Sequence, residues 1–443
     1  MNQADVIIVG GGLAGMCCAL SLQRAGLSAQ VFEACDAPGG RVRTDRVDGF
    51  LLDRGFQVFL TAYPEARAVL DLPALDLRTF EPGSRVFFGS SWHTLMDPWR
   101  RPGSLLDGAL AKVGSISDKV RVGTLRAEVQ KLPVAGLFAP ERPERTIEQL
   151  LRDRGFGRSM IDRFFRPFMG GIMLDSSLKS SSRMMEFVFK MFSEGDAAVP
   201  SGGMGRISDQ LASRLAPGTL WLNAKVERAA PGEVDIANVG TMRARAVVVA
   251  APGSSAEALL GAQSGSARWR RPWRGVTNVC MAIDGPPPQP GRDAVLLLDG
   301  ENTGPITNLA FMSSVSPLYA PAGKSLASLS VLGVDHRSDT ELLSACRSQL
   351  SRWFPSEDTA RWGLLRIQRI ASALPDQSPP WYTRAEWPVR LAAGPTRLAE
   401  RLYRAGDDVD TASIDGAMRS GRRAAEAIMA DLGVALPQRG ERP

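Results

Sequence analysis

The chain contains 443 residues, of which 44% are hydrophobic and 23% charged, and it carries a net charge of +6. This length exceeds what one hydrophobic core usually supports, so two domains are expected. The excess of 53 basic over 47 acidic residues is mild and comes with no nucleic-acid-binding motif, which excludes nucleic acid as an expected partner.

Simple patterns also indicate the compartment and exclude a metal site. No apolar run reaches the length of about 18 residues that a membrane span needs. The first strand begins almost at the N-terminus, so no targeting peptide is expected. The few histidines and cysteines lack metal-type spacing, which favours reduced thiols in the cytoplasm and no bound metal; they are Cys17, Cys18, Cys35, His93, Cys280, His336 and Cys346.

The first predicted unit is a strand, a glycine-rich turn and a helix. An apolar strand over residues 5–9 precedes three glycines, and a second apolar run ends in an acid; these are Gly10, Gly12, Gly15 and Glu33. Gly10 allows a tight turn, Gly12 lets the backbone approach a pyrophosphate, and Gly15 lets the helix lie close to the sheet. The first N–H groups of the helix suit phosphates, and Glu33 suits a ribose. The unit predicts a dinucleotide site.

Two later segments favour a dinucleotide that carries a flavin. Gly39, Gly40 and Arg41 add backbone N–H groups and a guanidinium to a pyrophosphate already held by the first helix. Near the C-terminus a strand ends at Asp407, and apolar residues at helical spacing begin at Ile414. The start of that helix is suited to stabilise negative charge on a reduced flavin, and Asp407 to hold the ribityl chain.

With these motifs the chain resembles the superfamily of flavin-dependent amine oxidases, protoporphyrinogen oxidases and phytoene desaturases. Residues 49–59 resemble the family's strand beneath the flavin, 199–204 its Pro-x-Gly-Gly-Met turn, and 222–226 and 246–252 the strands that return to the nucleotide domain. The plant and cyanobacterial phytoene desaturases are most similar, through residues 55–64 and 412–417. The resemblance implies FAD, held by Gly10, Gly12, Leu13, Ala14, Gly15, Glu33, Ala34, Gly39, Gly40, Arg41, Gly55, Phe56, Val226, Ala251, Gly406, Asp407, Ser413, Ile414 and Ala417.

The expected fold class is α/β, with a Rossmann-like, glutathione-reductase-like FAD-binding domain and a discontinuous α+β substrate domain. Because the nucleotide motifs fall in three separate stretches, two insertions must build the substrate domain. The FAD-binding domain is expected at residues 1–90, 200–270 and 385–432, the substrate domain at 91–199 and 271–384, and a tail at 433–443.

The two insertions show different patterns. The first is predicted to be mostly helical, and Thr146 with Gln149 forms a capping box at the start of one helix. The second contains β-type runs over residues 294–298 and 325–332, and a helix over 339–353 that should cover one face of the sheet.

Segments rich in Phe, Met or Trp suggest core packing or contact with apolar molecules. Residues 164–171 and 184–192 favour core packing, with the lining of an apolar substrate site as the alternative. Two basic and aromatic segments favour solvated loops, with peripheral membrane contact as the alternative. They comprise Trp92, residues 99–101, Leu105, Leu106, Leu110, Lys112, Lys119 and Arg121, and residues 269–274.

The expected chemistry is oxidation of a C–H bond by the bound flavin. Amine oxidases of the superfamily carry a lysine near the flavin, but the corresponding residues 275–282 contain none, which argues against amine oxidation. By resemblance Arg54 and Gln57 lie near the flavin and are the candidates for orienting the substrate, although a buried structural hydrogen bond is the favoured role for both. No general base is assigned, and a single nucleotide fingerprint favours oxygen or a quinone as the electron acceptor.

Three functions follow from these patterns. The first is an FAD-dependent oxidoreductase that desaturates or isomerises an apolar conjugated substrate, carotenoid-like by resemblance. The second is a protoporphyrinogen-type or amine-type oxidase on the same scaffold. The third is a non-catalytic prenyl-binding protein, because GDP-dissociation inhibitors of small GTPases share the architecture but hold no flavin.

Overall fold

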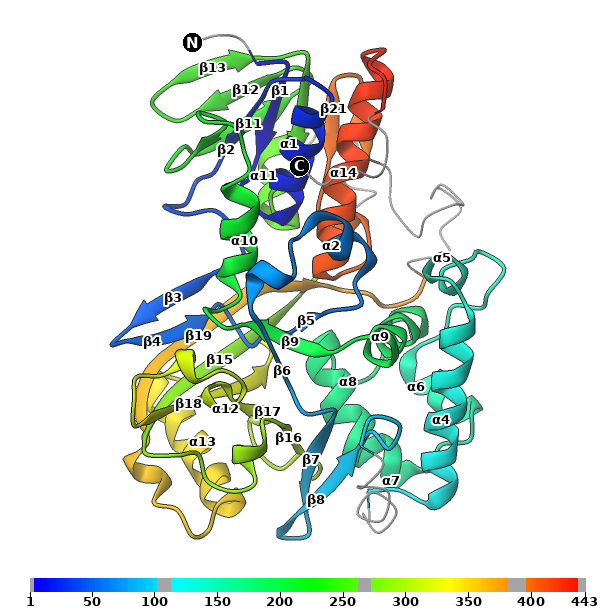
Figure 1. The fold of residues 1–443 in the computed structure, drawn as a ribbon, viewed down its shortest axis with the longest axis vertical. Helices are drawn as coiled ribbons and strands as arrows, with labels where there is room; N and C mark the ends of the chain where they lie inside the picture. Colours follow the sequence, from blue (N-terminus) through cyan, green and yellow to red (C-terminus); the bar gives the residue numbers. More distant parts are fainter. Residues whose placement is uncertain (1–3, 102–112, 262–271, 381–395, 437–443) are drawn as a thin grey trace.

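The computed structural model describes residues 4–101, 113–261, 272–380 and 396–436 (Figure 1). Two large sheets dominate these residues. A six-stranded sheet contains the first and the last strands of the chain, and a seven-stranded sheet lies at the opposite end of the molecule, next to a group of helices (Figure 1). Short strands from the chain between residues 44 and 79 connect the two halves.

The six-stranded sheet joins distant parts of the sequence. Its order is β10-β2-β1-β14-β21-β20, and every pair is parallel except β21 with β20. Ile8 lies opposite Val248, which in turn lies opposite Tyr403, so the predicted meeting of the chain's two ends is confirmed. The strands are β1 (Val6–Val9), β2 (Ala29–Phe32), β10 (Leu220–Trp221), β14 (Ala246–Val249), β20 (Arg397–Ala399) and β21 (Leu402–Arg404).

The central strands of this sheet are buried on both faces. Val6 and Ile8 pack on the side of α1 (Leu13–Arg24) and α14 (Ile414–Asp431). Ile7 and Val9 pack on the other side, against the three-stranded sheet of β11 (Val226–Ala230), β12 (Glu233–Ile236) and β13 (Gly240–Arg243) and helix α11 (Gly253–Leu260). Continuous apolar strands of this kind are typical of parallel sheets covered on both faces.

The seven-stranded sheet has the order β19-β15-β18-β17-β16-β7-β8. Helix α13 (Asp339–Trp353) covers one face with Leu342, Cys346 and Leu350, and it has the predicted bounds because Ser338 and Glu341 form a capping box. The strands are β7 (Gly83–Phe88), β8 (Ser91–Met96), β15 (Trp273–Asp284), β16 (Leu296–Asp299), β17 (Ile306–Phe311), β18 (Lys324–Leu332) and β19 (Gly363–Pro375).

Three expected boundaries are wrong. Strand β7 pairs with β16, so residues 83–88 belong to the second sheet rather than to the first 90-residue nucleotide unit. The strand expected over 294–298 begins at Leu296, because Ala294 has a positive φ of 53° that no strand residue adopts. Asn223, with φ of 53°, likewise makes residues 222–225 a connection between strands.

The described part of the first insertion is mostly helical, as predicted, and its strands lie at its two ends. Helix α6 begins after Thr146, whose hydroxyl accepts a hydrogen bond from the Gln149 N–H, so the predicted capping box is confirmed. The elements are β8, then α4 (Ile116–Lys131), α5 (Val134–Leu137), α6 (Ile147–Asp153), α7 (Arg158–Met160), a π-helical turn (Ile161–Phe165), α8 (Arg166–Met173), α9 (Ser182–Glu194) and β9 (Ala197–Pro200).

Small elements connect the two halves. The hairpin of β3 (Thr44–Val47) and β4 (Phe50–Asp53) lies beside β19 and β15 in Figure 1. A small sheet contains β5 (Phe59–Leu60), β9 and β6 (Leu77–Thr79). The other short helices are α2 (Pro64–Val69), α10 (Gly205–Ala212) and α12 (Met312–Val315). The 3-10 turns are η1 (Pro73–Leu75), η6 (Gly291–Asp293), η7 (Pro317–Tyr319), η8 (Thr359–Arg361) and η9 (Asp407–Val409).

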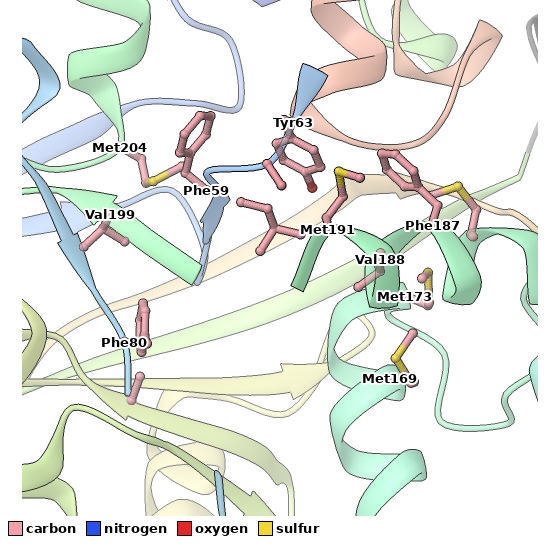
Figure 2. Close-up of a cluster of buried hydrophobic side chains, with 14 of the residues drawn as sticks. Phe59, Tyr63, Phe80, Met169, Met173, Phe187, Val188, Met191, Val199 and Met204 are labelled. Atoms are coloured by element: carbon pink, nitrogen blue, oxygen red, sulfur yellow. The ribbon is translucent and has the colours of Figure 1, made fainter. Parts of the chain in front are cut away.

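A large apolar cluster fills the space between these elements (Figure 2). Met185, Phe187 and Met191 from α9 are at most 1% exposed, so they pack as core residues. Phe164 and Phe168 are only half-buried and stack on each other with ring centroids 5.1 Å apart. The core interpretation therefore holds for the α9 residues, whereas the half-buried phenylalanines lie at the margin of the cluster.

Candidate functional site

The candidate site lies where the parallel strands of the six-stranded sheet end. The turn after β1 depends on glycines: Gly10 has a φ of 109°, and a Cβ there would lie 2.8 Å from the Ala250 carbonyl oxygen. A Cβ on Gly15 would lie 2.0 Å from the Gly10 carbonyl oxygen. The roles expected for Gly10 and Gly15 in the tight turn and in close packing of helix and sheet therefore match the geometry.

The start of helix α1 is open. Gly12 is its N-cap residue and forms no side-chain capping hydrogen bond, and a Cβ at Gly12 would have nothing within 4 Å. Leu13 and Ala14 follow as the first, buried residues of the helix. A helix start without a side-chain cap leaves backbone N–H groups and the positive end of the helix dipole for an anion.

The second glycine turn lies directly beside the first. The Gly39 N–H donates a hydrogen bond to the Gly11 carbonyl at 2.8 Å, and Gly12 and Gly39 form a parallel bridge. Gly40 has a φ of 58°, and a Cβ there would meet only the Gly12 Cα, at 3.7 Å. The two turns together form a groove lined by backbone.

Glu33 closes one end of this groove. Its carboxylate accepts hydrogen bonds from the Gly11 N–H at 2.7 Å and from the Cys35 N–H at 2.9 Å, and the side chain is buried. Ala34 is exposed beside it, and the Glu33 carbonyl accepts a bond from Ala224, two residues before Val226. Because a carboxylate can accept about four hydrogen bonds, Glu33 keeps acceptor capacity for a ribose hydroxyl.

Ala251 lies near the same turn, at the end of β14: a Cβ on Gly10 would be 3.3 Å from its backbone nitrogen. Arg41 and Asp407 come together from residues 366 apart in the sequence, and their two oxygen–nitrogen distances are 2.5 and 3.0 Å. Arg41 also lies over the Trp273 ring at 5.2 Å and donates to the Ala373 carbonyl. Arg41 was expected to bind the pyrophosphate and Asp407 the ribityl chain, whereas the structure pairs the two side chains with each other.

Helix α14 brings the remaining C-terminal candidates to this edge. Ser413 caps the helix by accepting a hydrogen bond from Gly416, and Ile414 and Ala417 are half-buried in its first turn. The Gly406 N–H donates to the Ser420 hydroxyl at 2.9 Å, which fixes the strand end against the helix. The starts of α1 and α14 therefore lie at one end of the sheet (Figure 1).

The catalytic candidates make structural contacts. The Gln57 amide donates to the carbonyls of Arg41 and Arg54 at 2.7 and 2.8 Å, which supports the structural alternative for Gln57. Gly55 and Phe56 lie between Arg54 and Gln57 in the chain. A Cβ on Gly55 would be 3.2 Å from Ile370, and the Phe56 ring packs edge-on against Phe80. These residues lie at the junction of the two sheets.

A pocket opens at this junction. Its walls come from β4, the following loop, β15, α12, η7 and β18. The lining residues are Leu51, Leu52, Asp53, Gly55, Phe56, Gln57, Cys280, Met312, Tyr319, Leu326 and Ser328. The sequence singled out Gly55, Phe56 and Gln57 only. Tyr319 lies in a turn without any motif, so no sequence signal could have linked it to residues 51–57.

One polar group in the pocket wall is fully satisfied. Asp53 accepts hydrogen bonds from the Thr44 hydroxyl at 2.5 Å, the Met204 N–H at 2.9 Å and the Tyr319 hydroxyl at 2.7 Å. Burial raises the pKa of Asp53 to about 6, against the opposing effect of these bonds. Burial also raises the pKa of Tyr319, and the adjacent carboxylate adds to the shift.

An open helix start, two glycine turns and a buried acid define a dinucleotide-binding α/β protein with a second, substrate-type sheet. Residues 13–429 match the family "Flavin containing amine oxidoreductase". The chain therefore belongs to the flavin-containing amine oxidoreductase family, a class of FAD-dependent oxidoreductases.

Curated relatives and solved structures agree with this assignment. The chain is 28% identical to chloroplastic protoporphyrinogen oxidase of Nicotiana tabacum over 48% of its length and 37% of the relative's. It is 29% identical to coproporphyrinogen III oxidase of Propionibacterium freudenreichii over 39% of its length and 32% of the relative's. The matched stretch is thus about a third of these relatives.

A putative protoporphyrinogen oxidase from Exiguobacterium sp. 255-15 has the same fold, with a TM-score of 0.70 at 18% identity over 98% of this chain and all of that one. The predicted fold class, an α/β FAD-binding fold with an α+β substrate domain, is confirmed. No helix in the described parts of the chain combines the length and apolar character needed to cross a bilayer.

Proposed function

We propose that the protein is an FAD-dependent oxidase of porphyrinogens. The pocket at the junction of the two sheets carries this proposal, because it joins apolar walls to the loop beside the nucleotide groove. The curated relatives oxidise protoporphyrinogen or coproporphyrinogen III by name. Residues 275–282, which contain no lysine, argue against the amine-type alternative.

FAD fits the groove. The open space at Gly12, the uncapped start of α1 and the spare acceptor sites of Glu33 match a pyrophosphate and a ribose. The other residues that we propose to hold FAD are those named in the sequence analysis. Among them, Arg41 and Asp407 would contact FAD as an ion pair. When bound, FAD supplies a hydride acceptor, with oxygen or a quinone proposed as the final electron acceptor.

The chain's own residues position the substrate and exclude water. Leu51, Leu52 and Leu326 provide apolar walls that keep solvent from the reacting carbon. We propose that the half with the six-stranded sheet binds the cofactor and the half with the seven-stranded sheet binds the substrate. Residues 83–88 then belong to the substrate-binding half.

A substrate comparison tests the proposal. The purified holoenzyme is expected to convert coproporphyrinogen III or protoporphyrinogen to the fluorescent porphyrin, and to bleach its flavin anaerobically with the same substrate. Phytoene serves as the competing substrate, because residues 55–64 and 412–417 resemble phytoene desaturases. Flavin bleaching by phytoene and not by either porphyrinogen would replace the first proposal with the carotenoid one.

We also propose that one face of helix α4 contacts a membrane surface. Ile116 and Val120 are 72% and 64% exposed on one face of the helix, and Trp99, 53% exposed, lies over Gly123 on the same face. Arg126 lies over the Trp99 ring at 5.2 Å. Exposed apolar residues bordered by basic ones are typical of interfacial segments.

Trp92, another residue of the predicted membrane segments, does not support contact. Trp92 packs in the second sheet, where its indole N–H donates to the Trp353 carbonyl at 3.0 Å. Leu105, Leu106, Leu110 and Lys112, and the second segment up to residue 271, lie outside the described residues.

Vesicle flotation tests the α4 face. Wild-type protein is expected to float with anionic vesicles, and an Ile116→Glu, Val120→Glu variant to lose most of that binding, because two carboxylates oppose both burial and surface charge. Val239→Glu changes an apolar residue, 56% exposed, in a distant hairpin and serves as the control. Equal flotation of all three proteins would contradict the proposal.

A further inference from the structure

Three arginines converge on one carboxylate at the edge of the pocket. Arg366 contacts Asp45 at 2.6 Å, Arg54 contacts it at 3.4 Å and Arg43 at 4.0 Å. Arg43 has a second acidic neighbour, Asp36, at 2.9 Å. The group, hereafter the arginine cluster (Arg43, Arg54 and Arg366), therefore keeps an excess of positive charge over these two acids.

The pairing of the strands shows that the cluster and the pocket share one face. Arg366 lies opposite Cys280, and Cys280 lies opposite Ser328 in the next strand. Opposite residues in antiparallel strands point to the same side of a sheet, and both Cys280 and Ser328 line the pocket. Asp45 likewise lies opposite Leu52, another lining residue. Ser328, Cys280 and Arg366 therefore form a row across three strands that leads from the pocket to the arginine cluster.

The guanidinium of Arg54 has donors to spare. Its one hydrogen bond to Asp45 is long, at 3.4 Å, and its Nε is buried without a partner among the described residues. The side chains of Arg54 and Arg366 are 29% and 34% exposed, so a ligand can reach both. A guanidinium presents five N–H donors, and a single shared carboxylate leaves several of them unused.

Charge also favours an added anion here. Although burial opposes it, the hydrogen bond from Arg366 and the charge of Arg54 hold the pKa of Asp45 below its ordinary value. Asp45 is therefore ionised at neutral pH and still outnumbered by its arginine neighbours.

We propose that the arginine cluster binds a carboxylate group of the substrate, while one apolar edge of the substrate packs against the residues that line the pocket. This inference rests on the proposed porphyrinogen oxidase function and names the substrate class more closely: an apolar ring system with acidic side chains. Arg54 and Arg366 are the positioning residues, because paired guanidiniums match a carboxylate in charge and geometry.

Binding of two porphyrins tests the inference without turnover. The probes are coproporphyrin III, which carries four carboxylates, and its tetramethyl ester, which carries none; quenching of their fluorescence reports binding. We expect the wild-type holoenzyme to prefer the acid, and Arg54→Gln and Arg366→Gln each to weaken acid binding at least about tenfold while leaving ester binding unchanged.

Arg369→Gln is the matched control. Arg369 lies in the same strand on the opposite face, where it pairs with Asp339 at 2.7 Å, so its loss should leave both affinities unchanged. A purely structural role of the cluster would lower the melting temperature without changing the preference for the acid over the ester. If either Gln variant fails to fold, the other still decides.

The outcomes separate the two proposals. Equal binding of acid and ester by the wild type, or an unchanged preference in both Gln variants, overturns the inference and leaves the porphyrinogen oxidase function standing. Binding of neither porphyrin overturns both. A preference for the acid that the Gln variants lose supports both.

Discussion

A Gly12→Ala variant is expected to fold as stably as the wild type but to bind FAD at least about tenfold more weakly. A Cβ at Gly12 has nothing within 4 Å, and its φ of −77° suits any residue, so the apo protein gains no strain. The added methyl instead occupies the path of a pyrophosphate toward the N–H groups of α1. Losing one hydrogen bond to a charged group costs about 1.5–3 kcal/mol, which is about tenfold or more in affinity.

Gly15→Ala should give the opposite result. Its Cβ would lie 2.0 Å from the Gly10 carbonyl oxygen, a backbone atom that cannot move without opening the turn between β1 and α1. Overpacking of this kind costs about 1–3 kcal/mol or more, so the melting temperature of the apo form should fall by several degrees.

Scanning fluorimetry of the apo proteins and FAD titration by flavin fluorescence measure the two effects separately. The glycine pair distinguishes a residue needed by the ligand from one needed by the fold. Equal melting temperatures for the two variants would contradict the packing role of Gly15. An unchanged FAD affinity in Gly12→Ala would show that the pyrophosphate lies elsewhere.

The secondary-structure elements that depend on a few neighbouring residues were predictable from the sequence. The glycine spacing after residue 9 fixed the turn and helix, because tight turns and close packing admit few other residues. Helix α13 was predicted over about residues 339–353 and has these bounds in the structure, where Ser338 and Glu341 cap its start. Resemblance, rather than periodicity, predicted that residues near 10 and 407 meet.

Contacts between particular side chains of the two sheets were not predictable. Asp53 and Tyr319 are 266 residues apart, and Asp45 and Arg366 are 321 apart, with no periodic signal to connect them. The assignment of residues 83–88 to the nucleotide unit was wrong for a similar reason: an alternating strand pattern does not reveal which sheet the strand joins, and β7 pairs with β16 in the second sheet. The cofactor groove was therefore visible in the sequence, and the pocket was not.

Asp53→Asn is expected to remove a large pH dependence of stability. The pKa of Asp53 is about 6 in the folded protein and 3.8 in the reference state, so folding favours the protonated acid. The native state holds this proton between about pH 4 and 6 while the unfolded chain does not, so stability falls as the pH rises through that range. The shift of about 2 units corresponds to about 3 kcal/mol lost at neutral pH.

An asparagine preserves the contacts without the charge. Its carbonyl can accept the bonds from Thr44 and Met204, and its amide can donate to the Tyr319 oxygen. The variant should therefore match the wild type near pH 3.5, below both pKa values, and exceed its free energy of unfolding by up to about 3 kcal/mol near pH 7.5.

Urea unfolding at the two pH values measures the difference. Asp45→Asn is the control of opposite sign, because arginines hold the pKa of Asp45 below its ordinary value and its loss should weaken the fold at neutral pH. An Asp53→Asn protein that is less stable than the wild type near pH 7.5 would mean that Asp53 is ionised at little cost. The pocket wall beside Gly55 would then carry a fixed negative charge, and an acidic substrate would depend even more on the arginines at its edge.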